Sequence, residues 1–138
     1  MTDITAIILT KNEEVNIERC IKSLSGVADR ICVVDSGSTD KTIEIAESLG
    51  AEIFHHEPFN HYAAQFNWAL DNVGIKTTWV YRIDADEVVT PELAAEIVDA
   101  CNEHRNDDVN GFVMKFLIAF MGKFLKHGGM YPFYNLTI

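Results

Sequence analysis

Two aspartates separated by a single residue are the sharpest chemical signal in the sequence. Asp84 and Asp86 follow the apolar run 79–83, with Ala85 between them. In an extended segment alternate side chains point to the same side, so both carboxylates face one way and Ala85 faces the other. Two hard oxygen ligands on one side suit Mg²⁺ or Mn²⁺ shared with a diphosphate. The pattern predicts a divalent-metal site at Asp84 and Asp86; the alternative is a solvated acidic turn.

A third aspartate occupies a comparable place. Asp35 directly follows the apolar run 31–34, where a carboxylate can accept hydrogen bonds from a base or a ribose. Gly37 allows the backbone to turn, and Ser38 and Thr39 can satisfy the free N–H groups of the next helix. We expect Asp35 to bind a ligand, because it has no capping duty of its own at that position. Ser38 and Thr39 are either helix caps alone or part of the same site.

The charge balance makes a cation part of this prediction. The chain has 138 residues, with 11 Lys+Arg against 21 Asp+Glu and a formal net charge of −10. This balance argues against DNA or RNA as the main ligand, because Lys and Arg drive phosphate binding. It also argues against simple electrostatic docking on anionic lipid. An acidic site repels a nucleotide diphosphate unless a divalent cation stands between them.

Composition places the chain among globular proteins. Its hydrophobic fraction is 48% and its charged fraction 23%, which is typical of one folded domain rather than a disordered tail. No stretch approaches about 18 uninterrupted apolar residues, and the N-terminus does not resemble a signal peptide. Cys20, Cys32 and Cys101 are far apart and lie in apolar surroundings. We expect three reduced, buried thiols in a cytoplasmic protein.

Short apolar runs must position these side chains. Strands are predicted at residues 4–9, 31–34, 51–54, 79–83 and 111–118. Because amphipathic segments separate the first four, the order of elements predicts an α/β sandwich with a mostly parallel sheet. In such a sheet ligands bind beyond the carboxyl ends of the strands. That edge is where the polar segments 10–14, 35–40 and 84–87 lie.

Four amphipathic segments predict helices. The first is expected after an Asn12 cap, with Val15 and Ile17 on its apolar face, and the second after Ser38 or Thr39. The third covers residues 62–70. The fourth begins with Thr90 as cap and Pro91 at its first position.

Other polar residues give weaker signals. His55, His56 and His61 could form a zinc site, but they lack a helical i, i+4 pair, so a loop or substrate contact is favoured. Gln65 and Asn67 lie on one predicted helix, where either could touch a nucleotide or both could be surface amides. His127 could face an acceptor or belong to an ordinary loop.

The last part of the chain is rich in aromatic residues. Seven Phe and Tyr residues lie between positions 112 and 134. A strand and an aromatic segment need something to pack on, so we expect a shortened chain that lacks an acceptor-side part. This segment could also pair with a second copy or dock on a membrane, or it could consist of core residues left uncovered.

Several motifs together resemble those of family 2 glycosyltransferases with the GT-A fold. The segments are IILTKNEE at 7–14, VVDSGSTDKT at 33–42 and DADE at 84–87. YAAQFNWAL at 62–70 and the segment 122–132 are similar to the branch that includes lipopolysaccharide-core β-glucosyltransferases. The resemblance covers nearly the whole chain, and its motifs stand in the right order at strand ends. It implies a Rossmann-like GT-A sandwich, with residues 1–138 as the nucleotide-sugar-binding domain.

The resemblance also implies a reaction and a set of roles. The reaction is an inverting transfer of a sugar from a nucleotide-diphosphate donor, often a UDP-sugar, to a glycan or lipid-linked acceptor in cell-envelope synthesis. Asp35 would contact the base, and Asp84 would approach the ribose and diphosphate beside the metal held with Asp86. The same nucleotide pocket would be lined by Thr10, Asn12 and Glu13.

The implied partners and catalytic groups are less complete. A homodimer and peripheral contact with the inner face of the membrane are both compatible with the resemblance. The general base is not assigned, because the family places it beyond the DADE motif. Residues 133–138 depart from the family pattern, which has an acidic residue after Tyr131-Pro132 and an arginine near this point. We therefore expect metal–nucleotide binding, with poor sugar transfer by this chain alone.

Two other classes of function remain as alternatives. One is a non-catalytic module that binds a nucleotide-sugar or another protein. The other is a haloacid-dehalogenase-like phosphatase, since residues 84–88 also fit a DxDx[TV] nucleophile motif. That motif normally opens its fold, whereas here it follows three strands. A receiver-like fold would need an aspartate after the third strand, where this chain has His55 and His56.

Overall fold

The computed structural model describes residues 2–128 and 131–138. The chain forms two compact units, Met1–Asp108 and Val109–Ile138. The larger unit contains the strand-end motifs that the sequence singles out. Within the described residues, no helix is long and apolar enough to cross a membrane.

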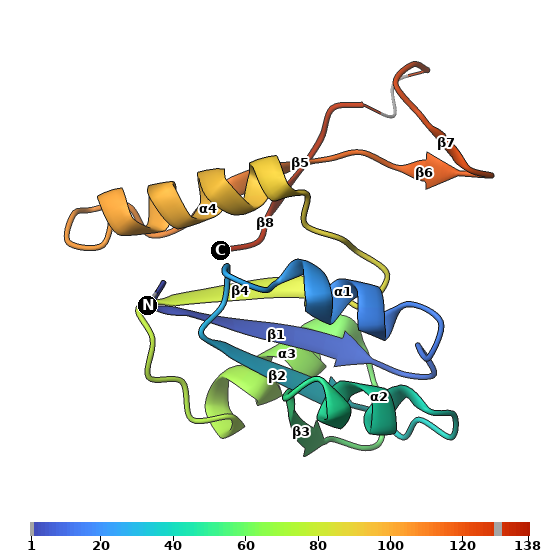
Figure 1. Ribbon diagram of the computed structural model, residues 1–138. Coiled ribbons are helices and arrows are strands. Elements are labelled where there is room, and N and C mark those ends of the chain that lie inside the picture. The colour runs from blue at the N-terminus through green and yellow to red at the C-terminus, as the bar shows by residue number, and fades with distance from the viewer. Residues whose placement is uncertain (1, 129–130) are drawn as a thin grey trace. The chain divides into compact units, whose positions relative to one another are not determined.

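A four-stranded parallel sheet forms the centre of the larger unit. Its strands stand in the order β3-β2-β1-β4, and every neighbouring pair is parallel (Figure 1). The strands are β1 (Ile4–Thr10), β2 (Arg30–Asp35), β3 (Glu52–His55) and β4 (Trp79–Asp84). The first four predicted strands and the parallel arrangement are thus confirmed.

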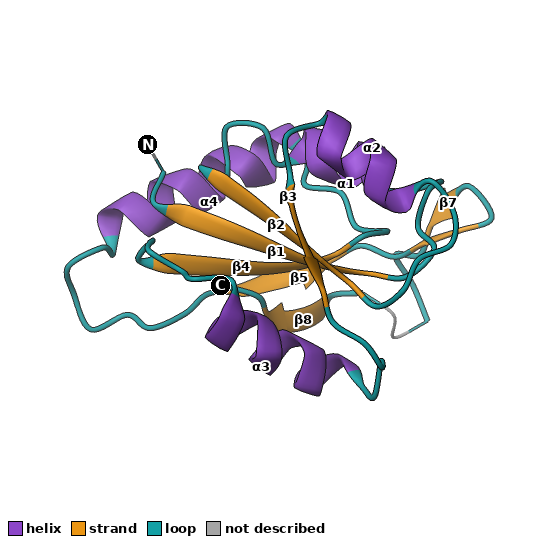
Figure 2. Ribbon diagram, turned by 90° about the horizontal axis from the view of Figure 1, so that it is seen from below, coloured by secondary structure: helices purple, strands orange, loops and turns teal. Residues whose placement is uncertain are grey.

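Helices cover both faces of this sheet. The helices are α1 (Ile17–Ser23), α2 (Thr42–Ser48), α3 (Tyr62–Asn72) and α4 (Pro91–Glu103). In Figure 2, α1, α2 and α4 lie on one face of the sheet and α3 lies on the other. This is a three-layer α/β/α sandwich, and it explains why β1 is buried at all seven positions: neither face is open to water.

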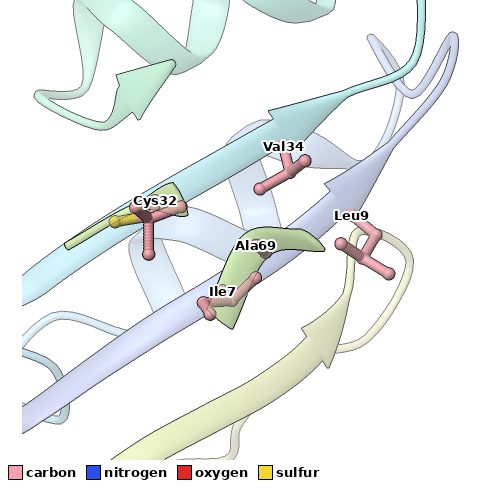
Figure 3. Packing of buried hydrophobic residues seen from close by; sticks show 6 residues of the cluster. Ile7, Leu9, Cys32, Val34 and Ala69 are labelled. Atoms are coloured by element: carbon pink, nitrogen blue, oxygen red, sulfur yellow. The ribbon is translucent and has the colours of Figure 1, made fainter. Parts of the chain in front are cut away.

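The core under α3 shows how the strands are held. Ile7 and Leu9 of β1, Cys32 and Val34 of β2, and Ala69 of α3 are buried against one another (Figure 3). Each large aliphatic side chain of this kind contributes about 1.5–3 kcal/mol when fully buried. All three cysteines of the chain are free and buried, as predicted. Burial raises the pKa of Cys20 to about 12 and that of Cys32 to about 11.

Two predicted helix starts were wrong. Helix α1 begins at Ile17 after Asn16, and Asn12 instead has a positive φ of 56° in the preceding loop. Val15 therefore lies outside the helix and is 86% exposed. Helix α2 begins at Thr42 rather than directly after Ser38 or Thr39. The reason in both cases is that the side chains of Asn12 and Ser38 bind the facing loop.

The fourth helix starts as predicted. Thr90 has an extended backbone, its hydroxyl accepts a hydrogen bond from the Leu93 amide at 3.3 Å, and Pro91 is the first helical residue. On the strand that precedes this helix, the Trp79 indole donates to the Cys101 carbonyl at 3.0 Å. These contacts attach α4 to β4 and fix where the chain leaves the 85–89 segment.

The smaller unit consists of two antiparallel strand pairs. Strand β5 (Val113–Phe116) pairs with β8 (Phe133–Leu136), and β6 (Ala119–Phe120) pairs with β7 (Lys123–Phe124). The predicted fifth strand at 111–118 is confirmed as a shorter element. Among the described residues it pairs only with β8, so it adds no parallel strand to the main sheet.

Candidate nucleotide and metal site

The carboxyl edge of the parallel sheet aligns three of the predicted site residues. In the strand register Thr10 lies opposite Asp35, and Leu9 lies opposite Asp84. Asp35 and Asp84 are therefore the last residues of β2 and β4, the two strands that pair with β1. The loops that follow these three strands start at the same edge of the sheet. The parallel arrangement produces this alignment, because all carboxyl ends of parallel strands point the same way.

Asp35 is fully buried and its carboxylate is occupied by the protein itself. Oδ1 accepts a hydrogen bond from the Thr10 hydroxyl at 3.1 Å and a short one from the Ser38 hydroxyl. Oδ2 accepts from the amides of Gly37 at 2.9 Å and Ser38 at 2.8 Å. Asp35 thereby folds the 36–38 turn. Glycine is favoured at position 37, since its φ is +90°, a backbone conformation that other residues rarely adopt.

The loops after β1 and β2 are locked to each other. The Asn12 side-chain oxygen accepts from the Thr39 amide at 2.8 Å, and the Asn12 amide donates to the Ser38 hydroxyl at 2.8 Å. The Glu13 amide donates to the Thr42 hydroxyl, also at 2.8 Å. Two of the residues expected to line the nucleotide pocket, Asn12 and Glu13, thus join the segments that follow β1 and β2. Neither Ser38 nor Thr39 caps α2.

Asp84 differs from Asp35 in its surroundings. One of its oxygens, Oδ1, is buried and has no hydrogen-bond partner among the described residues. Burial raises the pKa of this carboxyl group; Arg82 opposes the shift, while Asp86 and Glu13 add to it. A carboxylate oxygen without a hydrogen-bond partner can coordinate a cation. The residues present therefore fit the divalent metal that the sequence predicts.

The rest of the DADE segment forms a turn after β4, so the extended segment predicted there was wrong. Ala85 is buried at 3% exposure and Asp86 is exposed. Within residues 2–128 and 131–138, no three His, Cys, Asp or Glu side chains come together as a ready-made metal cluster. A cation at Asp84 and Asp86 would need further oxygen ligands, which a diphosphate or water can supply.

Glu87 belongs to the DADE motif, but no role in the site was predicted for it from the sequence. Its Oε2 accepts from the Asp84 amide at 3.1 Å, and its own amide donates to the Asp84 carbonyl at 3.0 Å. Burial raises the pKa of Glu87 to about 7, and the charges of Asp84 and Asp86 add to the shift. Glu87 fixes the turn that presents Asp84. The sequence feature that could have indicated this role is its position directly after Asp86.

A cavity of about 360 Å³ lies beside the carboxyl end of β1. Thr10 and Asn12 line it, whereas the predicted residues Glu13, Asp35 and Asp84 do not. The rings of Phe59 and Tyr62 meet edge to face at 5.3 Å on its wall. The remaining lining residues are Leu9, Lys11, Ser36 and Gln65. The sequence did not predict this aromatic pair, because nothing in residues 56–61 indicates where the Phe59 side chain points.

The histidines after β3 have local contacts. The His56 ring stacks on Trp68 with centroids 4.4 Å apart. His61 precedes α3 and its Nδ1 accepts from the Ala64 amide at 3.1 Å, which caps the helix. Both side chains therefore hold α3 in place, and α3 carries Gln65 at the cavity.

The model for "Glycosyl transferase family 2" matches residues 5–135. This chain belongs to glycosyl transferase family 2. It is 43% identical over 115 residues to an uncharacterised glycosyltransferase of Rickettsia bellii, covering 83% of this chain and 38% of the relative. It is 38% identical over 107 residues to the lipopolysaccharide core biosynthesis glycosyltransferase LpsC of Rhizobium meliloti, covering 72% of this chain and 38% of LpsC. The chain thus spans about two fifths of these relatives.

Solved structures show the same fold. Residues 1–349 of Staphylococcus aureus TarS match with a TM-score of 0.63 and 24% identity, over 80% of this chain and 34% of TarS. Glucosyl-3-phosphoglycerate synthase of Mycobacterium tuberculosis in complex with UDP matches with a TM-score of 0.52 and 28% identity, over 62% of this chain and 34% of the synthase. The α/β architecture is the GT-A fold that the sequence motifs predicted.

Proposed function

We propose that this chain forms the donor-binding part of a glycosyltransferase that moves a sugar from a nucleoside diphosphate to an acceptor hydroxyl. The observation that carries this proposal is the buried, unpartnered Oδ1 of Asp84 at the carboxyl edge of the sheet. The exposed carboxylate of Asp86 follows it. Family membership supports the proposal, because the matched relatives are glycosyltransferases by name.

Asp84 and Asp86 would hold Mn²⁺ or Mg²⁺ together with the donor's diphosphate. In support, a structure of the mycobacterial synthase, 28% identical with a TM-score of 0.50, contains Mn²⁺ and UDP. When bound, such an ion neutralises charge that develops on the leaving diphosphate. The aspartates hold the donor in place, and Glu87 keeps the turn that presents Asp84.

The donor in this proposal is a UDP-sugar. Its nucleoside would lie along the cavity beside β1, where Phe59 and Tyr62 offer a stacking surface. Thr10 and Asn12 line that cavity, and Asp35 and Glu13 support it through the two locked loops. In an inverting transfer the acceptor hydroxyl attacks the anomeric carbon as the diphosphate leaves. A general base must take the hydroxyl proton, and no described residue is assigned that role.

The acceptor would be a glycan or lipid-linked glycan of the cell envelope, as the printed name of LpsC suggests. In the unit 109–138 the charged side chains Lys115, Lys123 and Lys126 have no Asp or Glu beside them in the sequence. Phe120 and Phe124 of the β6–β7 pair are more than 60% exposed. These exposed lysine and phenylalanine side chains would support peripheral contact of a cytoplasmic protein with anionic lipid. A homodimer, detectable by light scattering, is the competing use of the same surface.

Calorimetry with UDP and Mn²⁺ tests the donor and metal roles. We expect saturable binding that needs the metal and that falls at least tenfold in Asp86→Ala, because one of two oxygen ligands is lost. Asp99→Ala, an exposed aspartate on α4, removes the same charge and should bind like the unchanged chain. Equal, metal-independent heats for all three proteins would refute the proposal. Hydrolysis or transfer of a UDP-sugar then separates an enzyme from a non-catalytic binding module.

A further inference from the structure

The carboxylate of Asp35 has no acceptor capacity left for a ligand. A carboxylate offers about four lone-pair sites. Asp35 uses four of them, for the two hydroxyls of Thr10 and Ser38 and for the two amides of Gly37 and Ser38. The residue is 0% exposed and does not line the cavity. An N–H group of a base would have to displace one of these bonds to reach it.

Gln65 is in the opposite state. It is 1% exposed, lines the cavity, and its Oε1 is buried with no hydrogen-bond partner among the described residues. Its Nε2 donates to the Val34 carbonyl at 3.3 Å. Because a carbonyl can only accept, this bond keeps the amide nitrogen on the side of β2. The oxygen is left as the acceptor that the protein does not use.

Helix α3 fixes the place of this side chain. Gln65 stands one turn before Ala69, so both lie on the helix face that meets the sheet. Figure 3 shows Ala69 over the strands beside Ile7 and Val34. One turn toward the start of α3 the same face reaches the carboxyl end of β1, where the cavity lies. Tyr62, three residues before Gln65, adds an aromatic wall.

We propose that Gln65, and not Asp35, binds the donor's base, with Oε1 accepting the N3–H of uracil while Asp35 positions the loops. The inference rests on the proposed function, since it presumes that a nucleotide enters this cavity. An acceptor without a partner at this point favours uracil, which has an N–H at ring position 3. Cytosine has a bare acceptor there, so Gln65 would face it with like partial charges.

The test compares UDP with N3-methyl-UDP, which lacks that N–H, in the presence of Mn²⁺. The proteins are the unchanged chain, Gln65→Met and Asn67→Leu. Gln65→Met replaces the amide by an apolar chain of similar length, and Asn67→Leu does the same at an exposed site on the same helix. We expect roughly tenfold weaker UDP binding in Gln65→Met, as for the loss of one buried hydrogen bond. Asn67→Leu should bind UDP normally.

The methylated nucleotide identifies the acceptor. It should bind the unchanged chain and Asn67→Leu more weakly than UDP, and Gln65→Met should lose this discrimination. If Gln65→Met binds weakly yet still prefers UDP over N3-methyl-UDP, another group accepts the N–H and the inference is overturned. If Gln65→Met does not fold, equal binding of both nucleotides to the unchanged chain overturns it as well. Failure of UDP to bind at all would reject the proposed function, and the inference with it.

Discussion

Asp35 and Asp84 both follow buried strands of the same sheet, yet their carboxylates are in opposite states. Asp35 accepts four hydrogen bonds from its own chain and is fully buried. Asp84 has a buried oxygen that has no hydrogen-bond partner among the described residues, and the pKa of its carboxyl group is raised. The same residue type at the same kind of position therefore serves two purposes. Asp35 holds the turn after β2, whereas Asp84 keeps an oxygen without a hydrogen-bond partner among the described residues.

Replacing Asp35 should have the largest effect on stability. Asp35→Ala leaves two amides and two hydroxyls without their acceptor in a buried place, so we expect a loss on the order of 3 kcal/mol or more in the free energy of unfolding. Urea unfolding followed by circular dichroism measures it. Asp99→Ala, exposed on α4, should change stability by less than about 0.5 kcal/mol. A stable Asp35→Ala protein that had lost only UDP binding would show that Asp35 is a ligand residue after all.

Replacing Asp84 should produce the reverse pattern. Asp84→Asn removes a charge that burial disfavours, so the metal-free protein should be at least as stable as the unchanged chain. Mn²⁺-dependent UDP binding should fall at least tenfold, because a neutral amide is a weaker cation ligand. Thermal unfolding without metal and calorimetry with it give the two readings. Undiminished metal-dependent binding would contradict the role assigned to Asp84.

Glu87, which holds the turn at Asp84, adds a test through the pH dependence of stability. Its pKa is about 7 in the folded chain against an ordinary value of 4.5, so between these values the folded state binds more protons than the unfolded state. Its contribution to stability is therefore present at low pH and is lost as pH rises toward 7. In metal-free protein, Glu87→Gln should flatten the decline of the melting temperature over this range. Glu92→Gln on α4 is the matched control, and an identical decline in both variants would contradict the raised pKa.

The smallest effect is expected at Thr10. Thr10→Val removes one of the four hydrogen bonds to Asp35 and should cost about 1 kcal/mol in the free energy of unfolding. Thr10→Ser keeps the hydroxyl and should recover part of this loss. Chemical denaturation of the two variants gives the difference. A loss in Thr10→Val as large as that in Asp35→Ala would mean that the other three bonds contribute little.

Most of the larger unit could be predicted because β1 and β2 are almost continuously apolar. A run such as 31–34, buried on both faces, is visible in the sequence whatever it contacts. The start of α1 could not be predicted in the same way. Asn12 is a good helix cap in isolation, but its side chain binds Thr39, 27 residues further along the chain. Contacts between loops compete with local capping preferences, and the sequence does not show them.

The features of the site that could be predicted from the sequence are likewise the local ones. Ala85 is buried and Asp86 is exposed, but residues 85 and 86 form a turn and one oxygen of Asp84 is buried, so the predicted extended geometry with both carboxylates on one side is not observed. Saturation of Asp35 depends on Thr10, which only the parallel register places opposite it. The free acceptor of Gln65 depends in turn on how α3 packs against β2. Roles that need two elements to meet are beyond what residue types and spacing reveal.

The mutual locking of the loops after β1 and β2 has a thermodynamic consequence for any molecule that enters beside them. Three hydrogen bonds of 2.8 Å join the two segments before anything binds. These two loops lose their conformational entropy when the protein folds. A ligand that binds beside them therefore needs little of its binding free energy to order them. Any closing motion around the ligand would have to come from other parts of the protein.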